Sequence, residues 1–194
     1  TDGFYLWNGS GWSLLMELDG TDLIYSATSL QGLLYFADGK HRIIKYDPDN
    51  NEICEPDATA PVVQYLITYQ ERIIGAGDAR TQAEVIADGG TWPADSNRNR
   101  VIFSETLDDV TWPPNNFIDC DTGTGEVVSG LGVNSINSAT KGAQTQLVVF
   151  KPHSTFINDG VLASADQKLN IVSNVHGCPG YHSIVNTPFG LVFT

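Results

Sequence analysis

The sequence predicts an all-β fold, a β-propeller-like array of short antiparallel blades, and three observations support this prediction. The first is a run rich in apolar and aromatic residues that returns along the chain. The four runs are 33–39, 72–78, 146–151 and 190–194. Their starts lie about 40 residues apart, or about twice that, a spacing typical of propeller blades that each hold several strands.

The other two observations concern what lies between these runs. Clusters of Gly, Pro, Asn and Asp separate short apolar segments. Between 37 and 40, Asp38 and Gly39 give a strong hairpin signal, because both residues tolerate a positive φ. No segment of the sequence combines a sustained 3.6-residue apolar periodicity with capping residues. We therefore expect little helix.

In chain order, the sequence divides into an incomplete unit, three larger units and a short last piece. The expected bounds are 1–27, 31–69, 71–133, 144–185 and a stub from Phe189. This makes about three and a half blades, whereas closed propellers have roughly 4 to 8. Because the sequence opens on Thr1 without Met and its last residues lie in an apolar run, we expect residues 1–194 to be one propeller segment of a longer chain. Further sequence or a neighbouring chain would close the ring, or the ring would stay open with its sheet edges covered.

One long segment, 78–100, is expected to leave its blade as a loop excursion, since it contains Gly89-Gly90, Pro93 and an Asn-Arg-Asn stretch. Loops of this length commonly carry function. Trp92, which precedes the proline, is expected to be exposed and is a candidate contact residue.

The charge balance limits the partners of the protein. It has 23 acidic and 10 basic residues, a formal net charge of −13. Binding to a phosphate backbone needs clustered Lys and Arg, and the sequence places basic residues close together only in small groups such as Arg98 and Arg100. The acidic balance therefore indicates either a surface kept soluble by its charge, or walls that let nucleic acid pass without holding it. No apolar stretch approaches the roughly 18 to 20 residues needed to span a bilayer, and the first residues lack the pattern of a signal peptide, so no membrane insertion is expected.

Three patterns could hold a metal, and each has an ordinary structural alternative. Cys54, Cys120 and Cys178 imply no disulfide framework and suit a protein core, although His176, Cys178 and His182 together could offer three zinc ligands without an evident fourth. The acidic loops 47–52 and 119–126 could wrap calcium, but neither has the full EF-hand spacing, and both suit plain hairpin turns. We expect no cofactor.

Motifs for catalysis are missing from the sequence. It contains neither a Gly-x-Ser-x-Gly nor a His-Glu-x-x-His pattern. Residues 104–112 loosely resemble the Asp-box of sialidases, lengthened by one residue, but Asp-boxes are structural turns and no catalytic set accompanies this one. We expect no enzymatic activity.

The most specific pattern is an ordered series of short segments. It comprises 100–104, a strand that ends in Ser; 109–119, with Asp, then Trp-Pro-Pro, then Asn-Phe-Ile-Asp; 123–131, a Gly-rich acidic turn that leads into Gly-Leu; and 147–151, Leu-Val-Val-Phe-Lys. Together with 177–185 and 189–193, which are similar to a following blade, this series resembles a propeller family found in bacteriophage virion and tail proteins. The likeness runs from about residue 31 to residue 194.

The resemblance implies a non-enzymatic structural component of a virion, at the tail hub or nozzle, where propellers surround or support the DNA exit channel. It implies synthesis in the host bacterial cytoplasm, other tail proteins and further copies in a ring as partners, and transient passage of genomic DNA without tight binding. In physical terms, the residues of this series are expected to pack the blades together. The expected blade anchors are Trp112, Pro113, Phe117, Gly123 and Gly125. We expect Trp112 in the blade core beside Phe103 and Phe117.

Two alternatives belong to other functional classes. A receptor- or glycan-binding propeller used in host attachment would stack sugars on exposed aromatic rings such as Trp7, Trp12 or Trp92. Because Trp7 and Trp12 flank a predicted hairpin turn, cross-strand packing is the favoured use of these two, and Trp92 is the better candidate for exposure. A hydrolase propeller is the least favoured.

Overall fold

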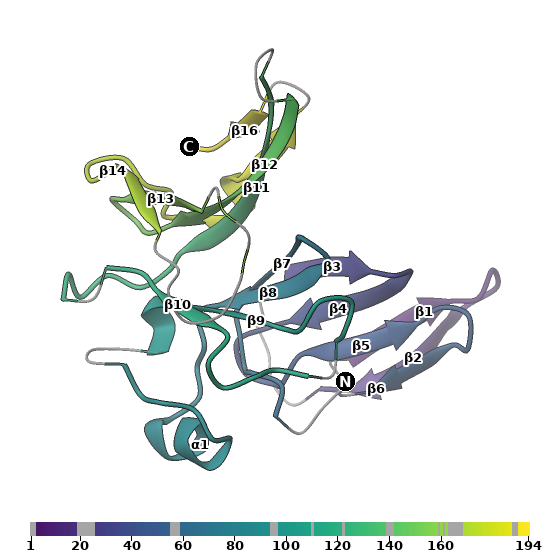
Figure 1. Ribbon diagram of the computed structural model, residues 1–194. Coiled ribbons are helices and arrows are strands. Elements are labelled where there is room, and N and C mark those ends of the chain that lie inside the picture. Colours follow the sequence, from purple (N-terminus) through teal and green to yellow (C-terminus); the bar gives the residue numbers. More distant parts are fainter. Residues whose placement is uncertain are drawn as a thin grey trace.

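The computed structural model describes residues 3–18, 26–54, 59–93, 97–109, 111–121, 123–138, 142–158, 160, 162, 169–187 and 190–194. These residues form an almost entirely β fold of antiparallel sheets with little helix, which confirms the predicted fold class (Figure 1). In the described part of the chain, no helix has the length and apolar character to cross a membrane.

Three four-stranded sheets follow one another along the chain, with a two-stranded hairpin before them and another after them. The strands are β1 (Gly3–Trp7), β2 (Trp12–Glu17), β3 (Ser26–Leu30), β4 (Leu33–Ala37), β5 (Ile44–Asp47), β6 (Glu52–Cys54), β7 (Tyr65–Tyr69), β8 (Arg72–Ala76), β9 (Arg100–Phe103), β10 (Phe117–Asp119), β11 (Gly130–Ser138), β12 (Gly142–Phe150), β13 (Thr155–Asn158), β14 (Asn170–Ser173), β15 (Val185–Thr187) and β16 (Gly190–Val192). We name the sheets blade 1 (β3–β6), blade 2 (β7–β10) and blade 3 (β11–β14). Each blade is a meander in which neighbouring strands in the chain pair in the sheet.

The recurring apolar runs of the sequence coincide with the second strand of each blade and of the last hairpin: β4, β8, β12 and β16. The expected unit bounds at Gln31 and Glu71 are therefore wrong by one strand. Gln31, Gln70 and Glu71 have positive φ values of 53°, 50° and 58° and form tight turns inside a blade. These turn residues, which are not glycine, join the first strand of a blade to the second rather than separating two blades.

The blades pack face to face, with their first strands nearest to one another. Strand β3 contacts β7, β7 contacts β11, and β11 contacts both β15 and β16. Successive residues of β12 consequently meet different layers: Leu147 and Val149 pack against blade 2, whereas Val148 and Phe150 pack toward β15–β16. Because both faces of this strand are covered at residues 147–150, these four residues form a continuous apolar run without polar alternation.

Residues 78–100 connect β8 to β9 and contain the short helix α1 (Gln82–Ala87) and the 3-10 turn Asn97–Asn99; a second such turn spans Tyr181–Ser183. Helix α1 begins with a capping box, in which Thr81 accepts from the backbone of Glu84 and the Glu84 side chain accepts from Thr81. The Thr-x-x-Glu pattern was visible in the sequence, but the helix is too short to show apolar periodicity. For this reason the sequence pattern did not predict the helix.

Candidate functional site

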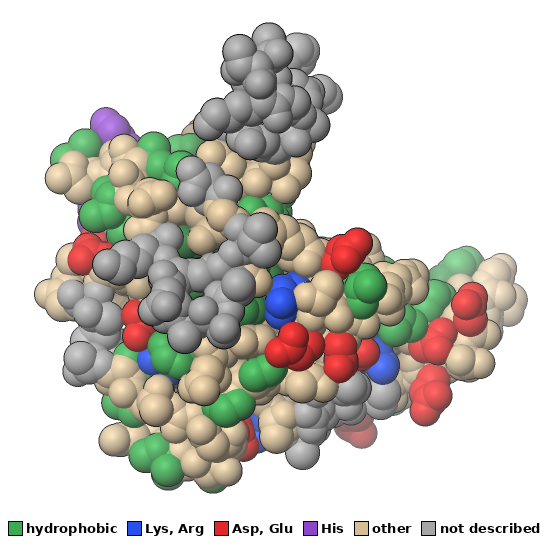
Figure 2. All heavy atoms as spheres, in the orientation of Figure 1, with side chains coloured by type: hydrophobic (Ala, Val, Ile, Leu, Met, Phe, Trp, Pro, Cys, Tyr) green, Lys and Arg blue, Asp and Glu red, His purple; other side chains and the backbone are tan. Residues whose placement is uncertain are grey.

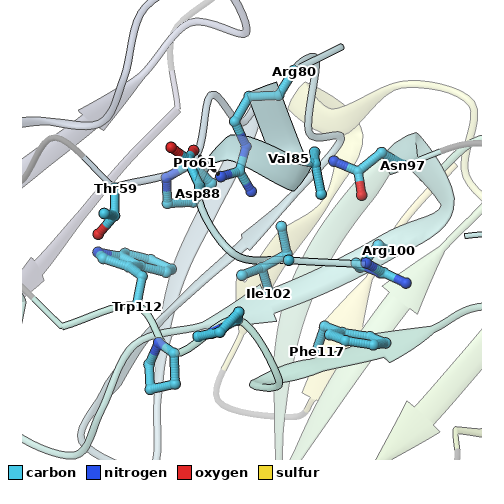
Figure 3. Close-up of a pocket in the computed structure, with 13 residues that line it drawn as sticks. Thr59, Pro61, Arg80, Val85, Asp88, Asn97, Arg100, Ile102, Trp112 and Phe117 are labelled. Atoms are coloured by element: carbon cyan, nitrogen blue, oxygen red, sulfur yellow. Dashed lines mark hydrogen bonds and ion pairs between the residues drawn. The ribbon is translucent and has the colours of Figure 1, made fainter. Parts of the chain in front are cut away.

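A small pocket lies where the segment 78–100 folds against blade 2 and the Trp-Pro-Pro turn (Figure 3). It encloses about 30 Å³, room for roughly one or two water molecules. The residues that line it are Thr59, Pro61, Arg80, Val85, Asp88, Gly90, Asn97, Arg100, Ile102, Trp112, Pro113, Pro114 and Phe117. Three of the five expected blade anchors, Trp112, Pro113 and Phe117, thus meet at one place.

Trp112 forms one side of the pocket and belongs to the apolar layer between blades 1 and 2. Its side chain is buried, it packs in one cluster with Ile102 and the partly buried Phe117, and its Nε1 donates to the carbonyl of Asp109 at 3.0 Å. Phe103, expected beside it, belongs instead to the layer between blades 2 and 3. Ile102 and Phe103 are consecutive residues of β9, so their side chains point to opposite faces of the sheet.

Arg100 connects the edge of the pocket to β10 through hydrogen bonds of its side chain. Its Nε and Nη2 donate to the two carboxylate oxygens of Asp119 at 2.7 and 3.1 Å, and Nη1 donates to the carbonyl of Thr91. The guanidinium carbon lies 3.5 Å from the centre of the Phe117 ring. A bidentate carboxylate pair and a cation–π contact hold this side chain, so it connects the segment 78–100 to the blade.

A second ionic group fixes the other end of the segment. Arg80 Nη2 donates to Asp78 Oδ2 at 2.6 Å and Nη1 donates to Asp88 Oδ2 at 2.8 Å, while Arg42 Nη1 lies 3.4 Å from the same Asp88 oxygen. Asn97 Nδ2 donates to Asp78 Oδ2 at 2.5 Å. Burial lowers the pKa of Arg80, but the hydrogen bonds and charges of Asp78 and Asp88 outweigh it and raise that pKa above its usual value. Arg80 therefore stays charged.

The side chains of the pocket hold two parts of the chain together. The two arginines of its lining are paired with aspartates. Within the described residues, the buried Asn97 Oδ1 accepts no hydrogen bond. The pocket is large enough for a water molecule, which could donate a hydrogen bond to this oxygen. The arrangement holds the segment 78–100 on blade 2.

The remaining anchors, Gly123 and Gly125, lie in the turn between β10 and β11, away from the pocket. Their φ values are 102° and 73°, a conformation that favours glycine. The fully buried Lys151 points into this turn, where its Nζ donates to the carbonyl of Asp121 at 3.0 Å and to Thr124 Oγ1 at 3.3 Å. The loop 119–126 thus offers two oxygen acceptors to the Lys151 ammonium group.

The other acidic loop, 47–52, forms a turn that the Asp47 side chain stabilises. The Asp47 carboxylate accepts from the backbone amides of Asp49 and Asn50 and from the Asn50 side chain, and this last bond lowers the Asp47 pKa most. Across the described ranges, no group of three or more His, Cys, Asp or Glu side chains is arranged to hold a metal.

Two of the three cysteines are core residues. Cys120 and Cys178 are buried free thiols, and burial raises the pKa of Cys120 far above its usual value. Cys178 Sγ lies 3.2 Å from the carbonyl of Gly180, and the flanking His176 and His182 are both exposed. The side chain of Cys54 lies outside the described residues.

The exposed tryptophans differ from those expected. Trp92, expected to be exposed, is half-buried, and the adjacent Thr91 is held by Arg100. Trp7 and Trp12 form a cross-strand pair with ring centres 5.4 Å apart, and they are 52% and 69% exposed. The hairpin explains the pairing but leaves both rings accessible, so this pair is the better candidate for an aromatic contact.

Comparison of the chain with protein-family models and with curated proteins gives no match.

Proposed function

We propose that the chain is a non-enzymatic structural component of a bacteriophage virion, a tail hub or nozzle propeller around or beside the DNA exit channel. The observation that carries this proposal is the ordered blade series, which resembles that family. Its residues are packing residues here: Trp112 and Phe117 meet blade 1, and Val149 and Phe150 meet the layers on both sides of β12. Other tail proteins and further copies of the chain would be its partners.

The distribution of charge supports a role beside a DNA path. Five basic residues, Arg42, Lys45, Arg72, Arg80 and Arg100, each pair with a carboxylate. On the face seen in Figure 2, acidic side chains gather at the right with few basic ones between them. Paired cations and a net charge of −13 suit a wall that repels the duplex.

We expect no measurable binding of the chain to duplex DNA at about 0.15 M salt, where the screening length is roughly 8 Å. Bound phosphates would need a Lys/Arg cluster that releases counterions. Fluorescence anisotropy with a labelled duplex checks this. Micromolar binding that weakens steeply with added salt would contradict it and indicate a nucleic-acid binder.

The virion role is tested by locating the protein in particles. Antibodies raised against the chain should label the tails of purified phage particles in electron microscopy, and mass spectrometry of the same particles should recover its peptides at a fixed ratio to known tail proteins. Recovery only as a secreted monomer, from cells without phage or prophage, would contradict the proposal.

A receptor- or glycan-binding propeller is the second candidate, and the exposed Trp7–Trp12 pair favours it. Aromatic faces of this kind can stack on sugar rings. If the pair binds glycans, calorimetric titration with host surface polysaccharide should give a binding signal that Trp12→Ala removes and Ile86→Ala, on α1, does not. Heat of dilution alone would contradict the glycan role.

A further inference from the structure

One face of the β1–β2 hairpin is apolar and exposed. In the register of the hairpin, Tyr5 pairs with Leu14 and Trp7 pairs with Trp12, so these four side chains share one face. They are 43%, 46%, 52% and 69% exposed in that order. Clustered, accessible Trp and Tyr side chains are typical of the centre of a protein interface.

The opposite face of the same hairpin is in contact with blade 1. The Phe4 ring lies 4.7 Å from the ring of Phe36, a β4 residue, and β2 contacts β6, the last strand of the blade. The hairpin therefore covers part of one face of blade 1, from β4 to β6, where strands of a preceding blade would lie.

Blade 3 carries a complementary gap. The β15–β16 hairpin covers its inner half, since both strands contact β11. Beside this hairpin lies an apolar pocket of about 190 Å³ lined by Val148, Ile157, Val172, Leu191 and Phe193 among others, with Val172 60% exposed. An apolar cavity of about 150 Å³ holds a benzene ring, so the pocket has room for an aromatic side chain.

We propose that the exposed face of the β1–β2 hairpin, centred on Trp12, packs into this pocket on blade 3 of a second copy of the chain. There, β15–β16 of one copy supplies the inner half of a four-stranded layer and β1–β2 of the next copy supplies the outer half. The two halves match the four-stranded blades inside the chain. Within one copy the hairpin and the pocket lie at opposite ends of the row of blades (Figure 1).

Charge favours a second copy at this place. Neither the four exposed side chains of the hairpin nor the lining of the pocket includes Asp, Glu, Lys or Arg. Two chains that each carry a net charge of −13 repel one another, and a contact between faces without charged groups limits that repulsion. Because the surfaces differ, the contact is head-to-tail, the kind that builds rings or filaments. This inference rests on the part of the proposed function that assigns further copies as partners.

Sedimentation velocity of the chain over a range of concentrations tests the interface. We expect the wild type to associate, and Trp12→Ser and Val172→Glu each to raise the dissociation constant at least about tenfold. Ile86→Ser, which changes a residue of similar exposure on α1, should leave it within about twofold. Unchanged circular dichroism and melting temperature will show that the variants fold.

Mixing the two variants distinguishes a head-to-tail contact from other modes. The Val172→Glu chain keeps an intact hairpin and the Trp12→Ser chain keeps an intact pocket, so the mixture should form dimers and no larger species. A wild type that stays monomeric, or a mixture that does not dimerise, would overturn the inference. Association that neither variant weakens would also overturn it while leaving the virion role standing, whereas absence of the chain from particles would refute that role without changing this measurement.

Discussion

Trp112→Ala is expected to destabilise the protein by about 3 to 5 kcal/mol. The side chain is 7% exposed and joins Ile102 and Phe117 in the layer between blades 1 and 2. Its removal leaves a cavity that the neighbouring Pro113 and Pro114 cannot close easily, because their rings restrict the backbone. The loss is a large part of the roughly 5 to 15 kcal/mol that stabilises a typical domain.

Urea denaturation followed by circular dichroism measures this change, at a protein concentration where the chain is monomeric. Trp12→Ala is the matched control, because Trp12 is 69% exposed, and we expect this change to lower the free energy of unfolding by less than about 1 kcal/mol. A loss below about 1 kcal/mol for Trp112→Ala would place its ring at the surface and reopen a contact role for this turn.

The sequence predicted the fold class because the strands are short and turn residues separate them. The bounds of the blades were harder to predict. The turn at Gln70 and Glu71 uses positive φ without glycine. Residues 147–150 of β12, which are covered on both faces, lack the alternation that marks a strand with one solvent face. A repeat of apolar runs gives the period of the blades but not the strand at which each blade starts.

The candidate site was predicted only in part. Trp112, Pro113 and Phe117 follow from local packing chemistry and meet at the pocket. The group formed by Asp78, Arg80 and Asn97 was not predicted, because Asp78 and Asn97 lie 19 residues apart and meet only when the segment 78–100 folds back. The close spacing of Asp78 and Arg80 and the capping box of α1 were the signals available in the sequence.

Asp78→Ala is expected to destabilise the protein by about 3 to 5 kcal/mol, since it removes one partner of a buried ion pair. Asp78 is 1% exposed and accepts from the guanidinium of Arg80 and from Asn97 Nδ2. In its absence, Arg80 keeps only the more accessible Asp88 carboxylate, and the amide of Asn97 loses its acceptor inside the fold. The segment 78–100 should then detach from blade 2.

Two measurements separate this local effect from general loss of structure. Hydrogen exchange should show increased exchange across residues 82–87 in Asp78→Ala, whereas β12, which lies in another layer, stays protected at low denaturant. Asp78→Asn, which keeps an oxygen acceptor of the same shape but removes the charge, should give an intermediate loss. Asp49→Ala, in an exposed turn, should change stability by less than about 0.5 kcal/mol. If Asp78→Ala were as stable as the wild type, the ionic group would contribute nothing to holding the segment 78–100 on blade 2. The pocket beside the ionic group would then have another role.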